Sequence, residues 1–382
     1  KGTITGFDST IYLERDTPML RRAAIGLLTA LLVTGCSTIG PPSVARDRFD
    51  YNKAVSDSWK EQTLLNIVKL RYADMPLFVE VASIVSGYTL EGAVNLSARF
   101  FDGGSAAEFG TTNQATIGGS GKYTDRPTIT YAPIAGSAFN KTFMTPIPPS
   151  AVLFMIQAGW PAQMVLPITL EAINGQRAQH SAGLRRQVGQ QGFYRIVELI
   201  TELQAAGAVG MRVRKRQDTE DSTVLVIRRD KVPPAVGAAR AELAQLLGIR
   251  DDASEYTIAY GEVASNDTEL AMLTRSTLAI MIELAGQVMV PPEHVADGRT
   301  LPSLLDTGDD DSHNLERRLI DIRSSRERPG DAFVAVRYRD HWFSIDDRDY
   351  PSKRTFAYLM LLFSLTESGG KEGLPLVTIP AG

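Results

Sequence analysis

The only cysteine of the chain, Cys36, is the residue whose type and position most plainly indicate chemistry. It follows the basic pair Arg21-Arg22 and an uncharged, mostly apolar run over residues 23–35. A basic start, an apolar stretch and small residues before a cleavage point form the layout of a secretory signal. The run is too short for a transmembrane helix, which needs about 20 apolar residues. Cleavage after Gly35 would make Cys36 the first residue of the mature chain.

The segment 19–40, with Val33-Thr34-Gly35-Cys36 at its centre, resembles the lipobox of bacterial lipoproteins. The resemblance implies that Cys36 carries a thioether-linked diacylglycerol and an N-acyl chain such as palmitate. Several acyl chains anchor a protein stably where one is marginal. Ser37, not Asp, follows the cysteine, which by analogy with lipoprotein sorting in Gram-negative bacteria implies the periplasmic face of the outer membrane. The lipid bilayer is therefore the first expected partner. The alternative interpretation is a buried cysteine after a chance apolar helix.

A glycine-rich stretch with a lysine, residues 118–122, could bind a nucleotide phosphate. A phosphate-binding loop needs glycine where Thr116 stands and serine or threonine where Tyr123 stands. It also needs a following helix, whereas strand-like alternation continues through the stretch. We therefore expect no nucleotide and no other cofactor.

The histidines form no recognisable metal or nucleophile motif, since no two stand at ligand spacing on a predicted helix. His341, with Asp346, Asp347 and Asp349 after it, could form an acid–base site. The same residues could instead be a solvated turn before a capped helix. We assign no catalytic residue, and a periplasmic hydrolase stays open as an alternative function.

Two charged clusters also allow a functional and a structural interpretation. An acidic stretch over 306–316 could bind Ca²⁺ through oxygen ligands or form an exposed loop, and we assign no metal ligand. A basic cluster over 212–216, with 228–229 across a predicted hairpin, could meet lipid head groups or be one solvated face of a sheet. The residues are Asp306, Asp309, Asp310, Asp311 and Glu316 in the first cluster, and Arg212, Arg214, Lys215, Arg216, Arg228 and Arg229 in the second.

Composition places the chain among folded proteins. Of its 382 residues, 43% are hydrophobic and 22% are charged. This proportion of apolar residues is sufficient to form a buried core. Lys and Arg number 40 against 44 for Asp and Glu, so we expect no nucleic-acid partner. A single cysteine excludes a disulfide framework within the chain and any multi-cysteine metal site.

Periodic patterns and chain breakers predict an α+β fold that combines helix–hairpin–helix units with a long amphipathic β-hairpin segment. The first unit would hold helices 191–206 and 234–247, closed by Gly207 and Gly248. The second would hold an apolar helix 270–290, a hairpin over 332–346 that turns through Arg339-Asp340, and a helix 352–366. The expected divisions are a non-native upstream extension from an over-extended reading frame or a fragment (1–18), a lipoprotein signal peptide (19–35), a tether (36–49), a helix and a buried strand (50–85), a Gly/Ser-rich β-hairpin region (86–131), a first α+β unit (132–248) and a second α+β unit (249–382) that contains an exposed connection over 291–330.

The hairpin is the most informative pattern. From Tyr88 to Phe100 apolar and polar residues alternate almost strictly, and the alternation returns over 115–124. A period of two predicts a strand with one apolar and one polar side. We call the first group the apolar set: Tyr88, Leu90, Gly92, Val94, Leu96, Ala98 and Phe100, with Ala115, Ile117, Gly119, Gly121 and Tyr123. The residues that alternate with them, from Thr89 to Arg99 and from Thr116 to Thr124, form the polar set. The residues expected to face a membrane or a neighbouring subunit are Tyr88, Leu90, Val94, Leu96, Phe100, Ile117 and Tyr123.

Three interpretations of the hairpin stay open. It is long enough to span a bilayer, with aromatic residues at its ends. Several copies would then have to close a shared barrel, since one hairpin leaves backbone groups unpaired in hydrocarbon. The hairpin could instead pack on its own domain or bridge subunits, or be a disordered loop.

The leading expected function is an outer-membrane-anchored lipoprotein that acts as a non-catalytic structural or assembly component of a cell-envelope complex. It would self-associate or bind other envelope proteins. The alternative is a ring-forming outer-membrane export (secretion) channel subunit. The organisation of this chain, with a lipobox, a folded body and an amphipathic β segment, resembles that of acylated lipoproteins of the curli-export channel type.

The lipobox generates the first prediction. Cys36→Ser removes the only thiol that can be acylated, so the variant should leave the membrane fraction. The measurement is sedimentation of membranes after a high-salt wash. A Cys36→Ser protein that still sediments with the outer membrane would contradict the lipid anchor or reveal a second one.

Overall fold

The computed structural model contains both helices and sheets, which confirms the α+β class. The residues that it describes are 7–12, 41–85, 87–99, 114–125, 127–180, 187, 189–214, 222–227, 234–302 and 318–367. The chain divides into two compact units: residues 1–56, 79–132 and 375–382 form the first, and residues 57–78 and 133–374 form the second.

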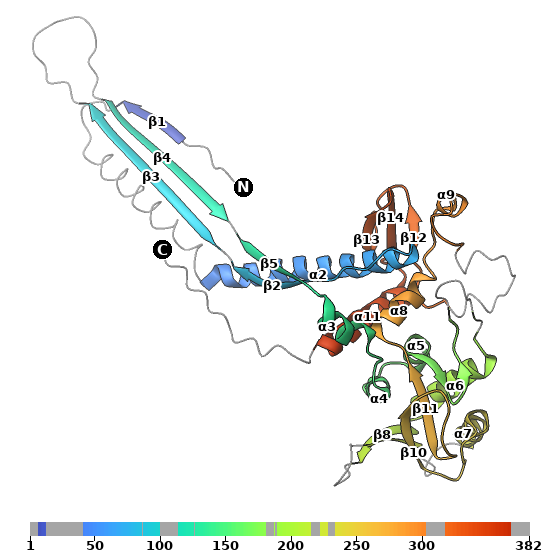
Figure 1. Ribbon diagram of the computed structural model, residues 1–382. Helices are drawn as coiled ribbons and strands as arrows, with labels where there is room; N and C mark the ends of the chain where they lie inside the picture. Colours follow the sequence, from blue (N-terminus) through green and yellow to red (C-terminus); the bar gives the residue numbers. More distant parts are fainter. Residues whose placement is uncertain are drawn as a thin grey trace, which may run out of the picture. The chain divides into compact units, whose positions relative to one another are not determined.

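The first unit is built around a long β-ribbon (Figure 1). Strands β3 (Tyr88–Arg99) and β4 (Gln114–Asp125) pair antiparallel along their whole length. The same two chain segments continue into strands β2 (Val79–Val85) and β5 (Thr128–Pro133), which form a two-stranded sheet. The two strands expected in the region 86–131 therefore pair as a hairpin.

Three expectations about the N-terminal part differ from the structure. Residues 36–49 are predicted as a tether, but helix α2 (Pro41–Arg71) begins at Pro41, because proline is compatible with a first helical turn. A buried strand is predicted at 77–85, but no residue of β2 is buried, because an apolar run does not itself supply a covering layer. Residues 7–12, placed by their sequence in an extension outside the fold, form strand β1 (Phe7–Tyr12) beside β4.

The second unit contains a six-stranded sheet of order β7-β6-β11-β10-β9-β8. Its pair β10–β11 is parallel and the other pairs are antiparallel. Because strands from both sides of residue 248 join it, the α+β units expected at 132–248 and 249–382 share one sheet. The strands are β6 (Leu170–Ile173), β7 (Gln176–Arg177), β8 (Val209–Arg214), β9 (Ser222–Ile227), β10 (Glu255–Tyr260) and β11 (Glu269–Thr274).

Helices α6 and α7 pack against each other beside this sheet and end where the sequence predicts. Gly207 and Gly248, just beyond them, both have φ of +65°, a left-handed conformation that stops a helix. A bidentate ion pair between Arg195 and Glu242, with N···O distances of 2.7 and 2.8 Å, joins the two helices. The helices of this region are α3 (Gly136–Phe139), the π-helical turn η2 (Asn140–Met144), α4 (Pro149–Gln157), α5 (Ala162–Thr169), α6 (Gln191–Ala205) and α7 (Pro234–Leu247).

A three-stranded sheet of order β12-β14-β13 follows. Its predicted hairpin turns through Arg339 and Asp340, whose φ values of +46° and +66° suit a two-residue hairpin loop. The elements are α8 (Thr277–Ala285), α9 (Pro292–Ala296), β12 (Arg323–Ser325), β13 (Ala332–Tyr338), β14 (His341–Asp346) and α11 (Tyr350–Glu367).

Two expectations about this half of the chain are wrong. The apolar run 270–290 is not one helix but strand β11 followed by α8, because a strand buried inside a sheet is as uniformly apolar as a buried helix. Ser276 marks the change, since its hydroxyl accepts the Ala279 N–H at 3.2 Å and caps α8. The connection 291–330 is not wholly exposed, because Ile320 and Ile322 lie in the core.

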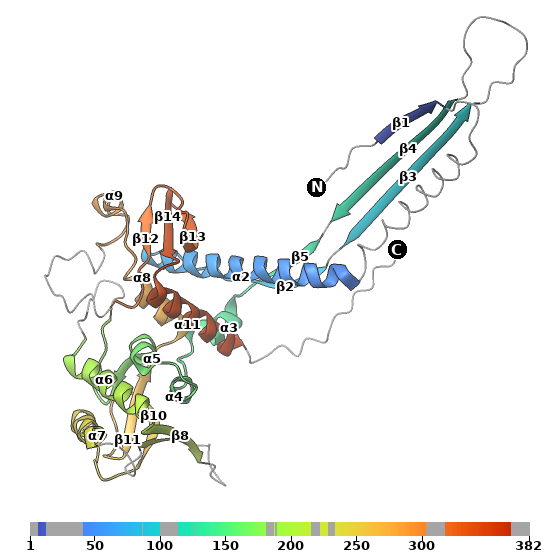
Figure 2. The same ribbon diagram turned by 180° about the vertical axis from the view of Figure 1, so that it is seen from behind.

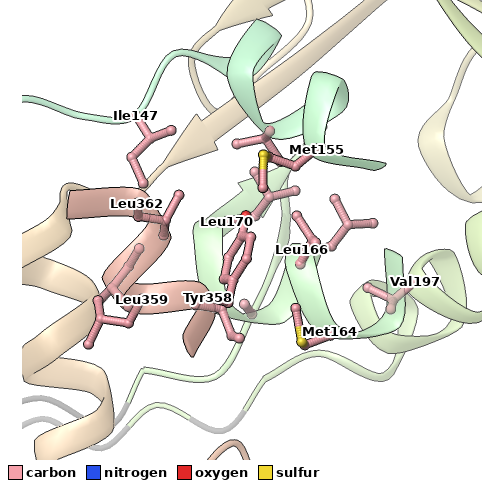
Figure 3. Close-up of a cluster of buried hydrophobic side chains, with 14 of the residues drawn as sticks. Ile147, Met155, Met164, Leu166, Leu170, Val197, Tyr358, Leu359 and Leu362 are labelled. Atoms are coloured by element: carbon pink, nitrogen blue, oxygen red, sulfur yellow. The ribbon is translucent and has the colours of Figure 1, made fainter. Parts of the chain in front are cut away.

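Helix α11 contributes Tyr358 to a core cluster of the second unit, where Tyr358 lies among Leu166, Leu170 and Met155 (Figures 2 and 3). The ring is fully buried, and its hydroxyl has no hydrogen-bond partner among the described residues. The equally buried Tyr256 instead donates to the Arg250 carbonyl oxygen at 2.7 Å.

These two tyrosines generate the second prediction. Tyr358→Phe should leave the free energy of unfolding unchanged or raise it by about 1 kcal/mol, because a buried hydroxyl without a partner is a cost. Tyr256→Phe should lower it by about 1–2 kcal/mol, because a made hydrogen bond is lost. Urea unfolding of both variants is the measurement. A Tyr358→Phe protein as destabilised as Tyr256→Phe would refute the assignment.

Candidate functional site

The first candidate site is the hairpin, whose two apolar sets meet in register. Leu90 stands opposite Tyr123, Val94 opposite Gly119, and Leu96 opposite Ile117. Residues directly opposite in an antiparallel ladder belong to the same side of the sheet. The alternation on β3 and that on β4 therefore describe one apolar and one polar side. Phe100, at the predicted end of the set, lies outside the described residues.

The middle of this ladder is poor in side chains. Gly92 stands opposite Gly121, and Val94 and Asn95 stand opposite glycines. Glycine weakens a strand and allows close approach of another backbone. Larger residues occupy the ladder toward both ends, so the centre depends chiefly on its backbone hydrogen bonds.

The two outer edges of the hairpin differ. On the β4 side, β1 pairs antiparallel with residues 114–119. On the β3 side, the described residues contain no further strand, and β3 pairs with β4 alone. An edge strand of twelve residues presents a row of backbone groups that another strand can pair with.

Lys122 belongs to this hairpin and not to a phosphate site. Residues 118–122 lie within strand β4, as the alternation predicted. The Lys122 Nζ atom lies 3.4 Å from a Glu91 carboxylate oxygen on β3, and both side chains are more than half exposed. Exposed pairs of this kind stabilise a fold by at most about 1 kcal/mol.

The second candidate site is the region of His341, where the sequence allowed an acid–base pair with Asp346. The two residues begin and end strand β14, about 17 Å apart at the usual rise per residue. In the ladder, His341 pairs with Tyr338 and Asp346 with Ala332, at opposite ends of β13. The structure therefore does not bring together the pair that a hydrolase site would need.

His341 instead belongs to an aromatic and charged cluster that sequence reasoning missed. Its Nε2 atom lies 3.3 Å from a Glu293 carboxylate oxygen, and its ring meets the His294 ring edge-on at a centroid distance of 4.9 Å. The His294 Nδ1 atom lies 2.7 Å from the Tyr72 hydroxyl. These residues come from the turn that follows α2, from α9 and from β14, so no short-range spacing could have revealed them.

The cluster continues on the other side of Tyr72. The Tyr338 hydroxyl donates to the Asp74 carboxylate at 2.9 Å, and the Tyr72 and Tyr338 rings lie 5.3 Å apart. The Arg339 guanidinium lies 5.4 Å from each ring centre. We call the whole group the Tyr72–His294 cluster; its members are Tyr72, Asp74, Glu293, His294, Tyr338, Arg339 and His341.

Burial fixes the protonation at the centre of the cluster. It raises the pKa of Tyr72 to about 12 and lowers the pKa of His294. Near neutral pH both groups are therefore uncharged, and one neutral hydrogen bond joins the Tyr72 hydroxyl to the His294 imidazole. Because His294 is only 2% exposed, the pair suits holding α2, α9 and the β13–β14 hairpin together better than reacting with a substrate. Besides Tyr72, the groups that act on His294 are His341 and Arg299, which lower its pKa further, and Glu293 and Asp297, which oppose them.

The other sequence candidates are distributed as follows. Cys36 and the acidic stretch from Asp306 to Glu316 lie outside the described residues. The Arg212 side chain on β8 is 71% exposed and lies 3.6 Å from a Glu255 carboxylate oxygen on β10, two strands away across β9, so it belongs to a solvated sheet face. Within the described ranges no group of three or more His, Cys, Asp or Glu side chains is placed to hold a metal ion. None of the described helices is long and apolar enough to cross a membrane.

The chain matches no family model, no curated protein and no solved structure with which it was compared. The functional argument therefore rests on the residues and geometry of the chain itself.

The Tyr72–His294 cluster generates the third prediction. Unfolded His294 takes up a proton near its ordinary pKa of about 6.5, whereas the folded side chain resists protonation. The free energy of unfolding should therefore fall as the pH drops from 7.5 to 5.5. A glutamine at position 294 can still form a hydrogen bond with Tyr72 but cannot titrate. The free energy of unfolding of His294→Gln should therefore fall less over this pH range than that of the unchanged protein.

Chemical denaturation at the two pH values measures this difference. Tyr338→Phe is the matched control, because it removes the hydrogen bond to Asp74 and keeps His294. It should retain the pH dependence of the unchanged protein. An identical acid-side loss in His294→Gln and the unchanged protein would exclude His294 as its source.

Proposed function

We propose that the protein is an outer-membrane-anchored lipoprotein that serves as a structural or assembly component of a cell-envelope complex and works as an oligomer. Two features support this. The lipobox around Cys36 supplies the anchor, and the β3–β4 hairpin supplies a surface that needs a partner.

The coincidence of the two apolar sets is the observation that carries the proposal. Twelve paired residues extend about 40 Å, with every apolar-set residue of β4 opposite an apolar-set residue of β3. Such agreement in phase is expected of a ribbon with one covered side. Lipid or a second protein surface is the covering layer that we propose.

A structural role agrees better with the second unit than catalysis does. His341 and Asp346 stand at opposite ends of β14, and the Tyr72–His294 pair is buried. These features support a structural role for the second unit.

The second candidate function, an export channel subunit, is favoured by strand length. Twelve residues exceed the ~9–11 that a membrane-spanning strand needs. The glycines in the middle of the ladder make its apolar set weak, which favours the first candidate. Conductance of the purified protein in planar bilayers separates the two: ion conduction supports the channel, and its absence from an assembled protein supports the structural role.

The apolar side generates the fourth prediction. Leu96→Arg places a charge opposite Ile117 in the apolar set and should shift the native mass toward the monomer. At a bilayer midplane the charge would cost about 2–4 kcal/mol in each copy. Asn95→Arg, opposite Gly118 in the polar set, is the matched control and should assemble normally. Mass photometry of detergent-extracted protein is the measurement, and equal behaviour of the two variants would remove the support for a covered apolar side.

A further inference from the structure

A cleft follows the outer edge of strand β13 in the second unit. Its volume is about 400 Å³, within the ~300–1,000 Å³ typical of ligand sites. One wall is helix α2, with Asp57, Lys60 and Glu61, and the other is the segment 328–330 that leads into β13. Residues 332–335 of β13 form the floor. Consecutive residues of a strand point to opposite faces, so a floor of consecutive residues lies along the edge of β13 that β14 does not occupy (Figure 1).

The turn of the β13–β14 hairpin determines which backbone groups of β13 point toward this cleft. Tyr338 and His341 flank a two-residue turn and are therefore a hydrogen-bonded pair of the ladder. Hydrogen-bonded and non-hydrogen-bonded pairs alternate along an antiparallel ladder. The N–H and C=O groups of Ala335 and Arg337 therefore point away from β14, toward the open edge.

Ala335 also lies on the floor of the cleft and is only 7% exposed. Among the described residues no backbone group pairs with its edge-facing N–H and C=O groups. A buried backbone group without a partner costs free energy comparable to a lost hydrogen bond. An extended peptide offers a donor and an acceptor at the spacing of a strand, which is what this edge lacks.

The two walls carry opposite charges that are not neutralised locally. Lys60 is neutralised within its own wall, because its Nζ atom lies 2.7 Å from an Asp57 carboxylate oxygen. Glu61 on α2 and Arg328 on the other wall are exposed, and neither forms an ion pair with a described residue. A ligand that complements the cleft therefore has a positive group near Glu61 and a negative group near Arg328.

These two charges lie on opposite sides of the sheet. The Tyr72 ring, at the end of α2, lies 6.1 Å from the buried Phe343 ring, which places α2 on the buried side. The Arg328 guanidinium lies 5.2 Å from the ring centre of Trp342, which neighbours Phe343 in β14 and points to the other side. A strand laid in the cleft would direct alternate side chains toward Glu61 and toward Arg328.

We propose that the β13 edge binds an extended segment of a partner protein, which adds as a strand beside Ala335 and carries a basic and an acidic side chain at neighbouring positions. The basic residue faces Glu61 and the acidic residue faces Arg328. Main-chain hydrogen bonds supply affinity, and the two charges select the sequence. The inference goes beyond the proposed function and rests on neither the lipid anchor nor the β3–β4 hairpin, since the second unit alone carries it.

Two synthetic peptides test the proposal on the full chain in detergent. Both have uncharged ends and a central Lys-Glu or Glu-Lys pair between Thr and Val residues, so that both orders of charge are present. Hydrogen exchange resolved to single residues is the measurement. At millimolar concentration at least one peptide should slow exchange of the Ala335 N–H about tenfold, because that group gains a partner, and leave Val336, already in the ladder, unchanged. The absence of slowing with either peptide overturns the proposal.

Methylation of both central backbone nitrogens supplies the peptide control. One of two consecutive N–H groups in a strand points toward its ladder partner, so the methylated peptide cannot pair through the centre but keeps both charges. It should bind about tenfold more weakly. Equal binding would show that charge alone holds the peptide, and strand addition would then be wrong.

A charge reversal in the protein tests the predicted wall. Glu61→Lys should weaken binding of the better peptide about tenfold, and a peptide with Glu in place of its Lys should recover it. Asp50→Lys is the matched control, because Asp50 is also exposed and lies about three turns earlier on α2. It should bind normally. Identical binding by Glu61→Lys and the unchanged protein would contradict the assigned orientation.

The remaining outcomes separate a partner protein from a second copy, and this inference from the proposed function. Exchange at Ala335 that slows with protein concentration alone would place a second copy in the cleft, which overturns the partner proposed here. The sedimentation of Cys36→Ser and the native mass of Leu96→Arg test the anchor and the hairpin independently of β13. Failure of the peptides therefore leaves the proposed function standing.

Discussion

Every backbone N–H and C=O group of a β-strand needs a hydrogen-bond partner. In a ribbon of two strands, the N–H and C=O groups on the outer edge of each strand have no partner within the ribbon. This constraint governs the first unit of the protein. The β3–β4 ladder is twelve residues long, and its centre is too rich in glycine to be stabilised by side chains alone. A strand added at an edge therefore supplies what the hairpin lacks, and β1 does so for half of β4.

In the second unit, by contrast, helices and strands from distant parts of the chain contribute side chains to one buried core. The buried hydrogen bond between Tyr72 and His294 joins the turn after α2 to α9. The bond between Tyr338 and Asp74 joins the same turn to the β13–β14 hairpin. These bonds hold the joined elements of the second unit in place relative to one another.

Lipid anchoring and association through the hairpin complement each other in the proposed function. An anchor confines copies to one membrane surface, which raises their local concentration and aligns them. Association through the apolar set then needs only modest affinity for each contact.

The sequence by itself determined the features that depend on neighbouring residues. A period of two predicted β3 and β4 nearly to their ends, Gly207 and Gly248 marked the ends of α6 and α7, and the polar pair Arg339-Asp340 marked a hairpin turn. The tertiary structure decided what depends on neighbours in space. Residues 270–290 form a strand and a helix because β11 pairs between β6 and β10 in the sheet. His341 contacts Glu293 and not Asp346 because His341 and Asp346 stand at opposite ends of β14. Local patterns record how a segment folds, whereas burial and partner choice arise only when segments far apart in the chain meet.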